Sequence, residues 1–270
     1  MSGKHKRRRN RAFHRAPQGA APGTLSAGED GTIQLRLLAY GVDTVVERTG
    51  GLADLPMLLE AAAGLPVRWI DVVGLGDIAA LEAIATLHNL HPLALEDVVH
   101  VHQRAKVEHF EDHDFITARM VQPGTTAGEE LDLEQVSLFV GAGWLLTFQE
   151  RHGDVFGAVR ERIRSARGRL RSAGADFLTY ALLDAIVDAA FPVLESYDNW
   201  LDRIERRIIA GAGQGVVAEL HRVRADLLVL RRAIWPLREA MSALVRDESP
   251  YFSPETRVFL RDCYDHCVQL

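Results

Sequence analysis

Apolar and polar residues follow two different periods along the middle of the sequence. Short runs rich in Val, Ile, Leu and Phe, bounded by turn residues, are typical of strands. Apolar residues three apart predict helix instead, as from Ile78 to Leu87. The predicted strands are TIQLRLLAY, VRWIDVVGLG, KVEHFE, DFITARMVQ, EQVSLFVGA and WLLTFQE, and the predicted helices are 77–90, HPLALEDVV and 155–171. This mixture predicts an α/β domain over residues 31–175.

The pattern changes near residue 176 to a heptad alternation. Apolar residues recur at spacings of three and four from Leu183 to Ile208, and again from Leu220 to Leu244. The segment GAGQG separates the two stripes. We therefore predict a long antiparallel helical hairpin over 176–248, with the stripes packed in its core. Pro236 lies in the second stripe and is expected to kink that helix.

A third long helix is predicted at 253–270. Ser253 suits the N-cap, Pro254 suits the first helical position, and Glu255 suits the positive end of the helix dipole. No Gly, Asn or Pro follows before Leu270, so this helix has a start signal and no stop signal. We expect the natural chain to continue beyond this point.

Charge is distributed unevenly. The formal net charge is −6, but residues 1–28 carry seven Lys or Arg and no acid, which leaves about −13 for the remainder. Residues 1–30 predict a disordered, solvated basic tail, because Ala, Pro and Gly follow the basic run. The acidic body argues against a specific nucleic-acid partner and suits the binding of cations.

Hydropathy and cysteine content indicate the compartment. No run approaches 18 uninterrupted apolar residues, so no segment is predicted to span a bilayer. No apolar segment follows the basic N-terminus, so we expect no secretory signal. Cys263 and Cys267 are too few for a disulfide framework, which favours a reducing, cytosolic setting.

Two stretches offer weak candidates for chemistry. GLGDIA at 74–79 loosely matches a dinucleotide-binding loop, but Asp77 would repel a pyrophosphate at the helix N-terminus, so a glycine turn is favoured. Six histidines lie in 88–113, where EHFEDHD could supply ligands to a structural zinc site, although no third ligand stands at a familiar spacing. The sequence has no HExxH, paired CxxC, P-loop or GxSxG motif, and so gives no support to an enzyme.

The final stretch, FLRDCYDHCVQL, carries a stronger pattern. Asp262 stands one helical turn from His266, and Cys263 one turn from Cys267. The first pair offers a hard oxygen and an imidazole on one face, which suits a divalent metal, while spacing alone leaves a solvated acid open. The thiols are expected to pack in a core.

Several stretches together resemble the cytoplasmic region of CorA-type magnesium transporters. They are HPLALEDVVHVHQRAKVEHFEDHDFI, LEQVSLFV with LLTFQE, DVFGAVRERIR, LLDAIVDAAF, RRAIWPLREAMSALVRD and RDCYDHCVQL, in order from about residue 65 to 270. The resemblance implies a layered α/β/α domain with a mixed sheet, then the helical hairpin, then the start of a long stalk helix that continues into a pore. It also implies a homopentamer in the plasma (inner) membrane, with this portion in the cytoplasm.

The same resemblance implies regulatory metal sites between neighbouring subunits. One joins Asp97, in LALEDVV, to Asp262, in RDCYDH. A second draws on Glu96, Asp184 and, through water, His266. Mg²⁺ is implied as both the sensed and the transported ion, with Co²⁺ as a further transported ion. Carboxylate pairs suit Mg²⁺, which prefers oxygen and keeps several waters.

The family's two membrane helices and its Gly-Met-Asn loop are absent from the sequence. We therefore expect the cation-sensing, pore-closing part of a transporter, a monomer or weak assembly on its own. Two alternatives stay open. One is a zinc transporter of the ZntB branch, favoured by the histidines of 88–113. The other is a soluble helical-hairpin module that binds a partner helix through its heptads.

Overall fold

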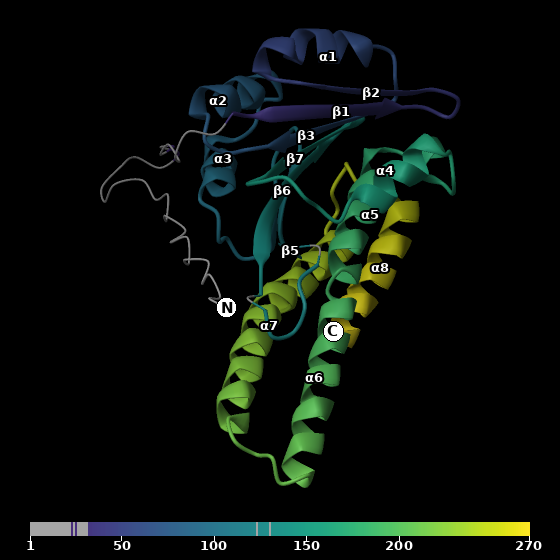
Figure 1. Ribbon diagram of the computed structural model, residues 1–270. Coiled ribbons are helices and arrows are strands. Elements are labelled where there is room, and N and C mark those ends of the chain that lie inside the picture. Colours follow the sequence, from purple (N-terminus) through teal and green to yellow (C-terminus); the bar gives the residue numbers. More distant parts are fainter. Residues whose placement is uncertain (1–22, 24, 26–31, 123, 130) are drawn as a thin grey trace.

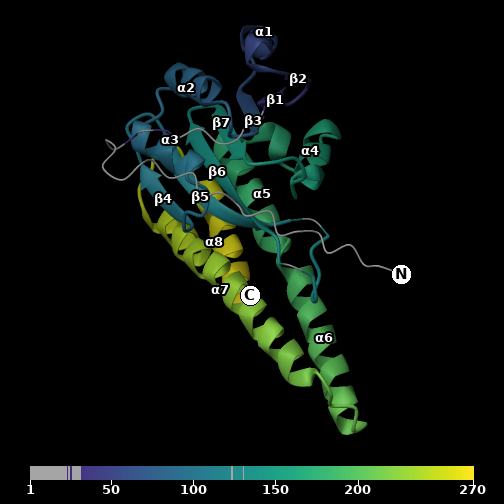
Figure 2. The same cartoon turned by 60° about the vertical axis from the view of Figure 1, so that its left-hand side comes forward.

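The computed structural model describes residues 23, 25, 32–122, 124–129 and 131–270. The predicted basic tail, 1–30, therefore lies outside the described residues except for Gly23 and Leu25. The described part is a layered body from which a helical hairpin projects, seen from two directions in Figures 1 and 2.

A mixed sheet of seven strands forms the centre of the body, in the order β2-β1-β3-β7-β6-β5-β4. Only β3 and β7 pair in parallel; the other neighbours are antiparallel. The strands are β1 (Gln34–Tyr40), β2 (Val45–Gly50), β3 (Val67–Val73), β4 (Lys106–His109), β5 (Asp114–Val121), β6 (Leu133–Gly141) and β7 (Trp144–Gln149).

Alternation along the strands explains why both faces of the sheet are covered. In β1, Leu35 and Leu37 point into one hydrophobic core, whereas Leu38 and Tyr40 point into the other. A sheet buried on both faces requires helices on each side. The first face carries η1 (Leu52–Asp54), α1 (Leu55–Ala61), α2 (Ile78–Leu87) and α3 (Pro92–Val99). The second carries α4 (Gly157–Arg164), η2 (Leu170–Ser172), α5 (Ala175–Asp188) and the C-terminal part of α7 (Val216–Arg246), and α8 (Pro254–Gln269) packs on α5 and α7. This confirms the predicted α/β/α layering (Figure 1).

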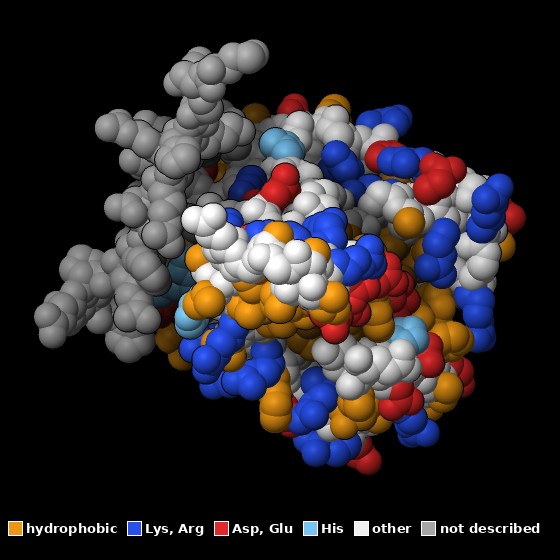
Figure 3. Space-filling model, turned by 60° about the horizontal axis from the view of Figure 1, so that its bottom comes forward, with side chains coloured by type: hydrophobic (Ala, Val, Ile, Leu, Met, Phe, Trp, Pro, Cys, Tyr) orange, Lys and Arg blue, Asp and Glu red, His pale blue; other side chains and the backbone are white. Residues whose placement is uncertain are grey.

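The projecting hairpin consists of α6 (Phe191–Ile209) and α7 (Val216–Arg246). Gly215, at the start of α7, has a φ of 82°, a conformation that glycine adopts without strain. α7 continues through Pro236, and its C-terminal part packs against α8. Figure 3, turned toward this end of the molecule, shows apolar side chains lying between Lys and Arg side chains.

The first arm of the predicted hairpin is not one helix. The stripe from Leu183 to Ile208 is divided, because α5 ends at Asp188 and α6 begins at Phe191. Pro192 explains the break: it has no N–H to donate to the carbonyl of Asp188, four residues earlier, where a continuing helix would need that bond. α5 therefore covers the sheet, and α6 alone forms the first arm of the projecting hairpin.

Other predicted elements differ in extent. The helix predicted over 155–171 is the shorter α4 followed by the single turn η2. The sequence patterns gave no prediction for β2 or α1. The predicted division of the chain at 31, 176 and 253 stays a prediction.

Helix α8 begins as its sequence predicts. Oγ of Ser253 accepts a hydrogen bond from the N–H of Thr256 at 3.2 Å, and Pro254 occupies the first turn. Cys263 and Cys267 lie in the core that α8 shares with α5. The cysteines therefore pack, as expected.

One stretch, Ala175–Ile209, is long and apolar enough to cross a membrane by length and composition, with a mean hydropathy of 1.7 over an 18-residue window. This stretch escaped prediction because acids such as Asp176 and Asp184 interrupt its apolar residues. More than half of that window, 56 %, is buried inside the fold. Its burial in α5, which lies between the sheet and α8, accounts for its apolar character.

Candidate functional site

The five predicted metal ligands fall into two groups on opposite sides of the sheet. Glu96 and Asp97 lie on α3, in the first helical layer. Asp184 lies on α5, and Asp262 and His266 lie on α8, in the second layer (Figure 1). Within one chain, the sheet separates Asp97 from Asp262.

The second group, which we call the α5–α8 cluster, comprises Asp184, Asp188, Asp262 and His266. Nδ1 of His266 lies 3.6 Å from Oδ1 of Asp184, and Nε2 of the same ring lies 3.9 Å from Oδ2 of Asp262. Ligand atoms of Asp184, Asp188 and His266 all lie within 4.8 Å of one another. Each helix supplies two residues one turn apart, so packing α5 against α8 brings the four together.

Two buried atoms of this cluster face each other as an ion pair at 3.6 Å but lack a hydrogen bond within normal distance. Oδ1 of Asp184 and Nδ1 of His266 are buried, and neither has a hydrogen-bond partner among the described residues. Burial, followed by the charge of Asp188, raises the pKa of Asp184 above its usual value, whereas His266 acts to lower it. Unpaired buried polar atoms cost free energy. Two carboxylates and an imidazole are a donor set that fits a small divalent cation.

Sequence reasoning missed Asp188. Its signal is the four-residue spacing from Asp184 in LLDAIVDAAF, which places both carboxylates on one face of α5. The surrounding apolar residues directed attention to packing instead of to this pair.

The first group, which we call the α3 cluster, comprises Glu96 and Asp97. Both acids already have partners within the chain. Nζ of Lys106 lies 2.6 Å from Oδ2 of Asp97 and 2.7 Å from Oε1 of Glu108. Burial alone would lower the pKa of Lys106, but its hydrogen bonds to Asp97 and Glu108 raise it above the usual value. Oε2 of Glu96 accepts a hydrogen bond from the N–H of Gly23 at 2.6 Å. These acids border an open hollow of about 430 Å³ lined by Leu93, Glu96, Asp97, Glu108, His109 and Phe110.

The histidines of 88–113 do not form a metal centre. His88 packs on Trp144, His91 on Phe110, and His113 on Phe139, with ring centroids 4.7, 4.8 and 5.4 Å apart. Nδ1 of His109 is 2.7 Å from Oδ1 of Asp114. Within the described ranges, only the α5–α8 cluster brings three His, Cys, Asp or Glu side chains close enough to share a metal ion. The structural zinc site therefore has no support in this part of the chain.

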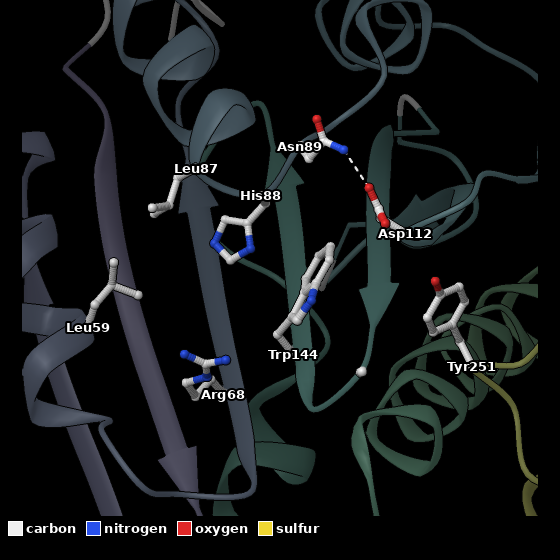
Figure 4. A pocket seen from close by; sticks show the side chains of 9 residues that line it. Leu59, Arg68, Leu87, His88, Asn89, Asp112, Trp144 and Tyr251 are labelled. Carbon is white, nitrogen blue, oxygen red and sulfur yellow. Dashed lines mark hydrogen bonds between the residues drawn. The ribbon is translucent and has the colours of Figure 1, made fainter.

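His88 instead borders an open cavity of about 520 Å³ (Figure 4). Burial, followed by the charges of Arg68 and His113, lowers the pKa of His88 to about 4. The ring is therefore neutral near pH 7. Across the cavity, Nδ2 of Asn89 donates a hydrogen bond to Asp112.

The glycine loop at 74–79 also has a structural explanation. The carboxylate of Asp77 accepts a hydrogen bond from the N–H of Ala80 at 3.0 Å and so caps α2. Gly74 has a φ of 98°, and a Cβ there would lie 2.9 Å from the carbonyl oxygen of Thr32. This segment is a tight turn whose helix N-terminus is already occupied by an acid.

Solved structures share this arrangement of elements. The soluble domain of CorA from Methanocaldococcus jannaschii superposes with a TM-score of 0.68 at 18 % identity, covering 87 % of this chain and 88 % of that one. The cytoplasmic domain of ZntB from Vibrio parahaemolyticus gives a TM-score of 0.61 at 13 % identity, covering 88 % of this chain and 89 % of that one. The chain shares the fold of these two domains, and at these identities the likeness concerns the fold alone.

Sequence comparisons carry the assignment further. The family model described as CorA-like Mg²⁺ transporter protein matches residues 66–270. The cobalt/magnesium transport protein CorA of Thermotoga maritima is 37 % identical over 259 residues, which is 94 % of this chain and 72 % of that protein. The chain therefore belongs to the CorA-like Mg²⁺ transporter family.

Proposed function

We propose that this chain is the cytoplasmic, cation-sensing part of a magnesium transporter of the plasma (inner) membrane. Mg²⁺ is the sensed ion and, with Co²⁺, a transported one. The observation that carries the proposal is the α5–α8 cluster, in which buried Oδ1 of Asp184 faces buried Nδ1 of His266 at 3.6 Å without a hydrogen-bond partner among the described residues. A hydrated divalent cation would satisfy both atoms.

The separation of the two clusters favours a ring of subunits. A contact that joins two different faces of a subunit is heterologous, and repeating it generates a ring when the rotation between copies closes. With the α3 cluster on one side of the sheet and the α5–α8 cluster on the other, such a contact brings Asp97 of one copy to Asp262 of the next. Glu96 then joins Asp184 and, through water, His266 in a second site. We propose that five copies close the ring.

Gating follows from the charge at these contacts. Without metal, carboxylates of neighbouring copies repel one another, and bound Mg²⁺ offsets that repulsion. Mg²⁺ thus favours the symmetric, closed arrangement, and its loss lets the domains shift. α8 contributes Asp262 and His266 and packs on both α5 and α7, so movement at the site reaches this helix directly.

The test combines thermal unfolding with light scattering, each with and without millimolar MgCl₂. We expect Mg²⁺ to raise the melting temperature and the mass of the wild-type chain, and Asp262→Asn to remove both effects. Asp265→Asn is the matched control, because this exposed acid lies on α8 outside the cluster. The proposal is contradicted if Mg²⁺ changes neither the melting temperature nor the mass of the wild-type chain.

The same measurement discriminates the alternative functions. The exposed apolar side chains near the end of the hairpin, Ile209 at 79 % and Val217 at 68 %, favour a helical interaction module as the second candidate. A dimer that is insensitive to metal supports that module. A response to Zn²⁺ but not to Mg²⁺ supports a zinc transporter.

A further inference from the structure

Lys106 holds the position that a cation would take on Asp97. Its ammonium lies between two carboxylates, 2.6 Å from Oδ2 of Asp97 on α3 and 2.7 Å from Oε1 of Glu108 on β4. The side chain is 32 % exposed, and its Nζ lies 5.7 Å from the ring centroid of Phe115. The charge is therefore at the surface of the α3 cluster, with a path to solvent.

The residue type at this position is unusual for this chain. Of its 31 Lys and Arg residues, only Lys4, Lys6 and Lys106 are lysines. Every other cation after residue 6 is arginine, including the partner of Asp71 in the core and the partner of Glu47 at the surface. Where this sequence needs a permanent ion pair it uses arginine, so a lysine beside Asp97 calls for a different explanation.

Lysine and arginine neutralise a carboxylate differently. The guanidinium of arginine forms two parallel hydrogen bonds with a carboxylate, which hold it in place. The lysine ammonium is a compact point charge on a flexible stem, and it resembles a small cation more closely. Lys106 is thus a counterion that can leave Asp97 at low cost.

Lys106 and a metal ion cannot both occupy Oδ2 of Asp97 as it stands. Mg²⁺ binds oxygen at roughly 2.0–2.1 Å, while Nζ already lies 2.6 Å from Oδ2 of Asp97. Two positive charges this close repel strongly. We propose that Lys106 is an internal competitor of the divalent cation: it neutralises Asp97 when no metal is bound, leaves when the metal binds, and so weakens the site. This inference rests on the proposed function, because it concerns the regulation of the same site.

The chain offers a direct chemical test. Lys106 is the only lysine beyond the N-terminal tail, so its reaction with an amine-acetylating reagent is measurable by peptide mass spectrometry, with Lys4 and Lys6 as internal references. We expect MgCl₂ to raise the acetylation rate of Lys106, with the midpoint that calorimetry gives for Mg²⁺ binding. Acetylation that stays constant or falls while calorimetry detects Mg²⁺ binding overturns the inference.

Two substitutions test the affinity in opposite directions. Lys106→Met removes the competitor and should tighten Mg²⁺ binding by about tenfold, whereas Lys106→Arg supplies a stronger competitor and should weaken it. Arg164→Met is the matched control: it removes one paired charge at the β2 edge of the sheet, opposite β4, and should leave the affinity unchanged. A purely structural Lys106 would lower the melting temperature on substitution without tightening Mg²⁺ binding.

The outcomes separate the two proposals. A wild-type chain that binds no Mg²⁺ contradicts the proposed function itself. Normal wild-type binding with the same affinity in Lys106→Met and Lys106→Arg contradicts only the role of Lys106. If Lys106→Met does not fold, which circular dichroism would show, the acetylation rates of the wild-type chain decide the question.

Discussion

Asp71 on β3 and Arg160 on α4 form an ion pair at 2.6 Å that is buried between the sheet and the second helical layer. The same guanidinium reaches Asp154, also at 2.6 Å. Burial raises the pKa of Asp71, and the charge of Arg160 opposes that rise. One arginine is therefore shared by two carboxylates that have little access to water.

Removing Arg160 should destabilise the fold strongly. Arg160→Met leaves Asp71 buried and uncompensated, and we expect a loss of about 3–5 kcal/mol in the free energy of unfolding. Urea unfolding followed by circular dichroism measures it. Replacing both members of the pair, Asp71→Leu with Arg160→Met, should recover part of the loss because no unpaired charge remains at that position.

The exposed pair Arg164–Glu47 is the control for that experiment. Its two partners lie 2.8 Å apart but are accessible to solvent. Arg164→Met should cost less than about 1 kcal/mol. Equal losses for Arg160→Met and Arg164→Met would show that burial does not determine the strength of the first pair.

Local signals predicted some elements well and others not at all. Ser253 and Pro254 mark the start of α8, and Pro92 marks the start of α3, because capping depends only on neighbouring residues. β2 escaped prediction because it is an edge strand whose side chains are only partly buried, so the strand alternation is weak. The heptad spacing also continues across Pro192, which hid the break before α6.

Asp188 provides a test of the α5–α8 cluster that sequence reasoning did not offer. Its charge lies one turn from Asp184 and raises the pKa of that residue, after the effect of burial. Asp188→Asn should therefore stabilise the metal-free chain by about 0.5 kcal/mol, because a like-charge pair is removed. The same substitution should reduce the stabilisation by Mg²⁺, because a ligand is lost.

Opposite signs in the two conditions distinguish this prediction from a general effect on folding. Melting temperatures of wild type and Asp188→Asn, each with and without MgCl₂, give both quantities. Asp198→Asn is a suitable control, because this exposed acid lies on the neighbouring helix α6. A variant that keeps the full response to Mg²⁺ would exclude Asp188 from the site.

The candidate site was predictable only in part, for a physical reason. Spacing along α8 placed Asp262 and His266 on one face. The approach of Asp184 depends on how α5 packs against α8, and no pattern along the sequence encodes that packing. Only the family resemblance placed Asp184 in one site with His266. Neither residue spacing nor the family resemblance predicted the contact of Lys106 with Asp97, since a lone lysine beside acids is usually solvated.

The two cysteines should be inert in the folded chain. Cys263 is fully buried and Cys267 is 4 % exposed. The hydrogen bond with Cys267, followed by burial, raises the pKa of the Cys263 thiol, so little reactive thiolate forms. We expect no reaction with a disulfide reagent at pH 8 in native buffer, and reaction of both thiols in denaturant. Rapid stoichiometric modification of the native chain would contradict the packing of α8.

His88 should make the fold sensitive to acid. Its pKa is lowered to about 4 in the folded chain, by burial first and then by Arg68 and His113. In the unfolded chain it returns to about 6.5. Between these values the unfolded chain binds more protons than the folded one, so the free energy of unfolding falls as the pH is lowered. The loss begins below about pH 6.5 and is complete below about pH 4, where it reaches up to about 3 kcal/mol.

Replacing His88 by phenylalanine should flatten this dependence, because the ring contact with Trp144 is kept while the titrating group is removed. Urea unfolding at pH 7.5, 5.5 and 4.5 gives the two curves. The difference between wild type and His88→Phe should grow in favour of the variant as the pH falls. His152→Phe, at an exposed histidine, controls for the loss of a histidine as such. Parallel curves for wild type and His88→Phe would mean that the imidazole stays accessible to protons in the fold, and that the cavity beside Trp144 does not desolvate it.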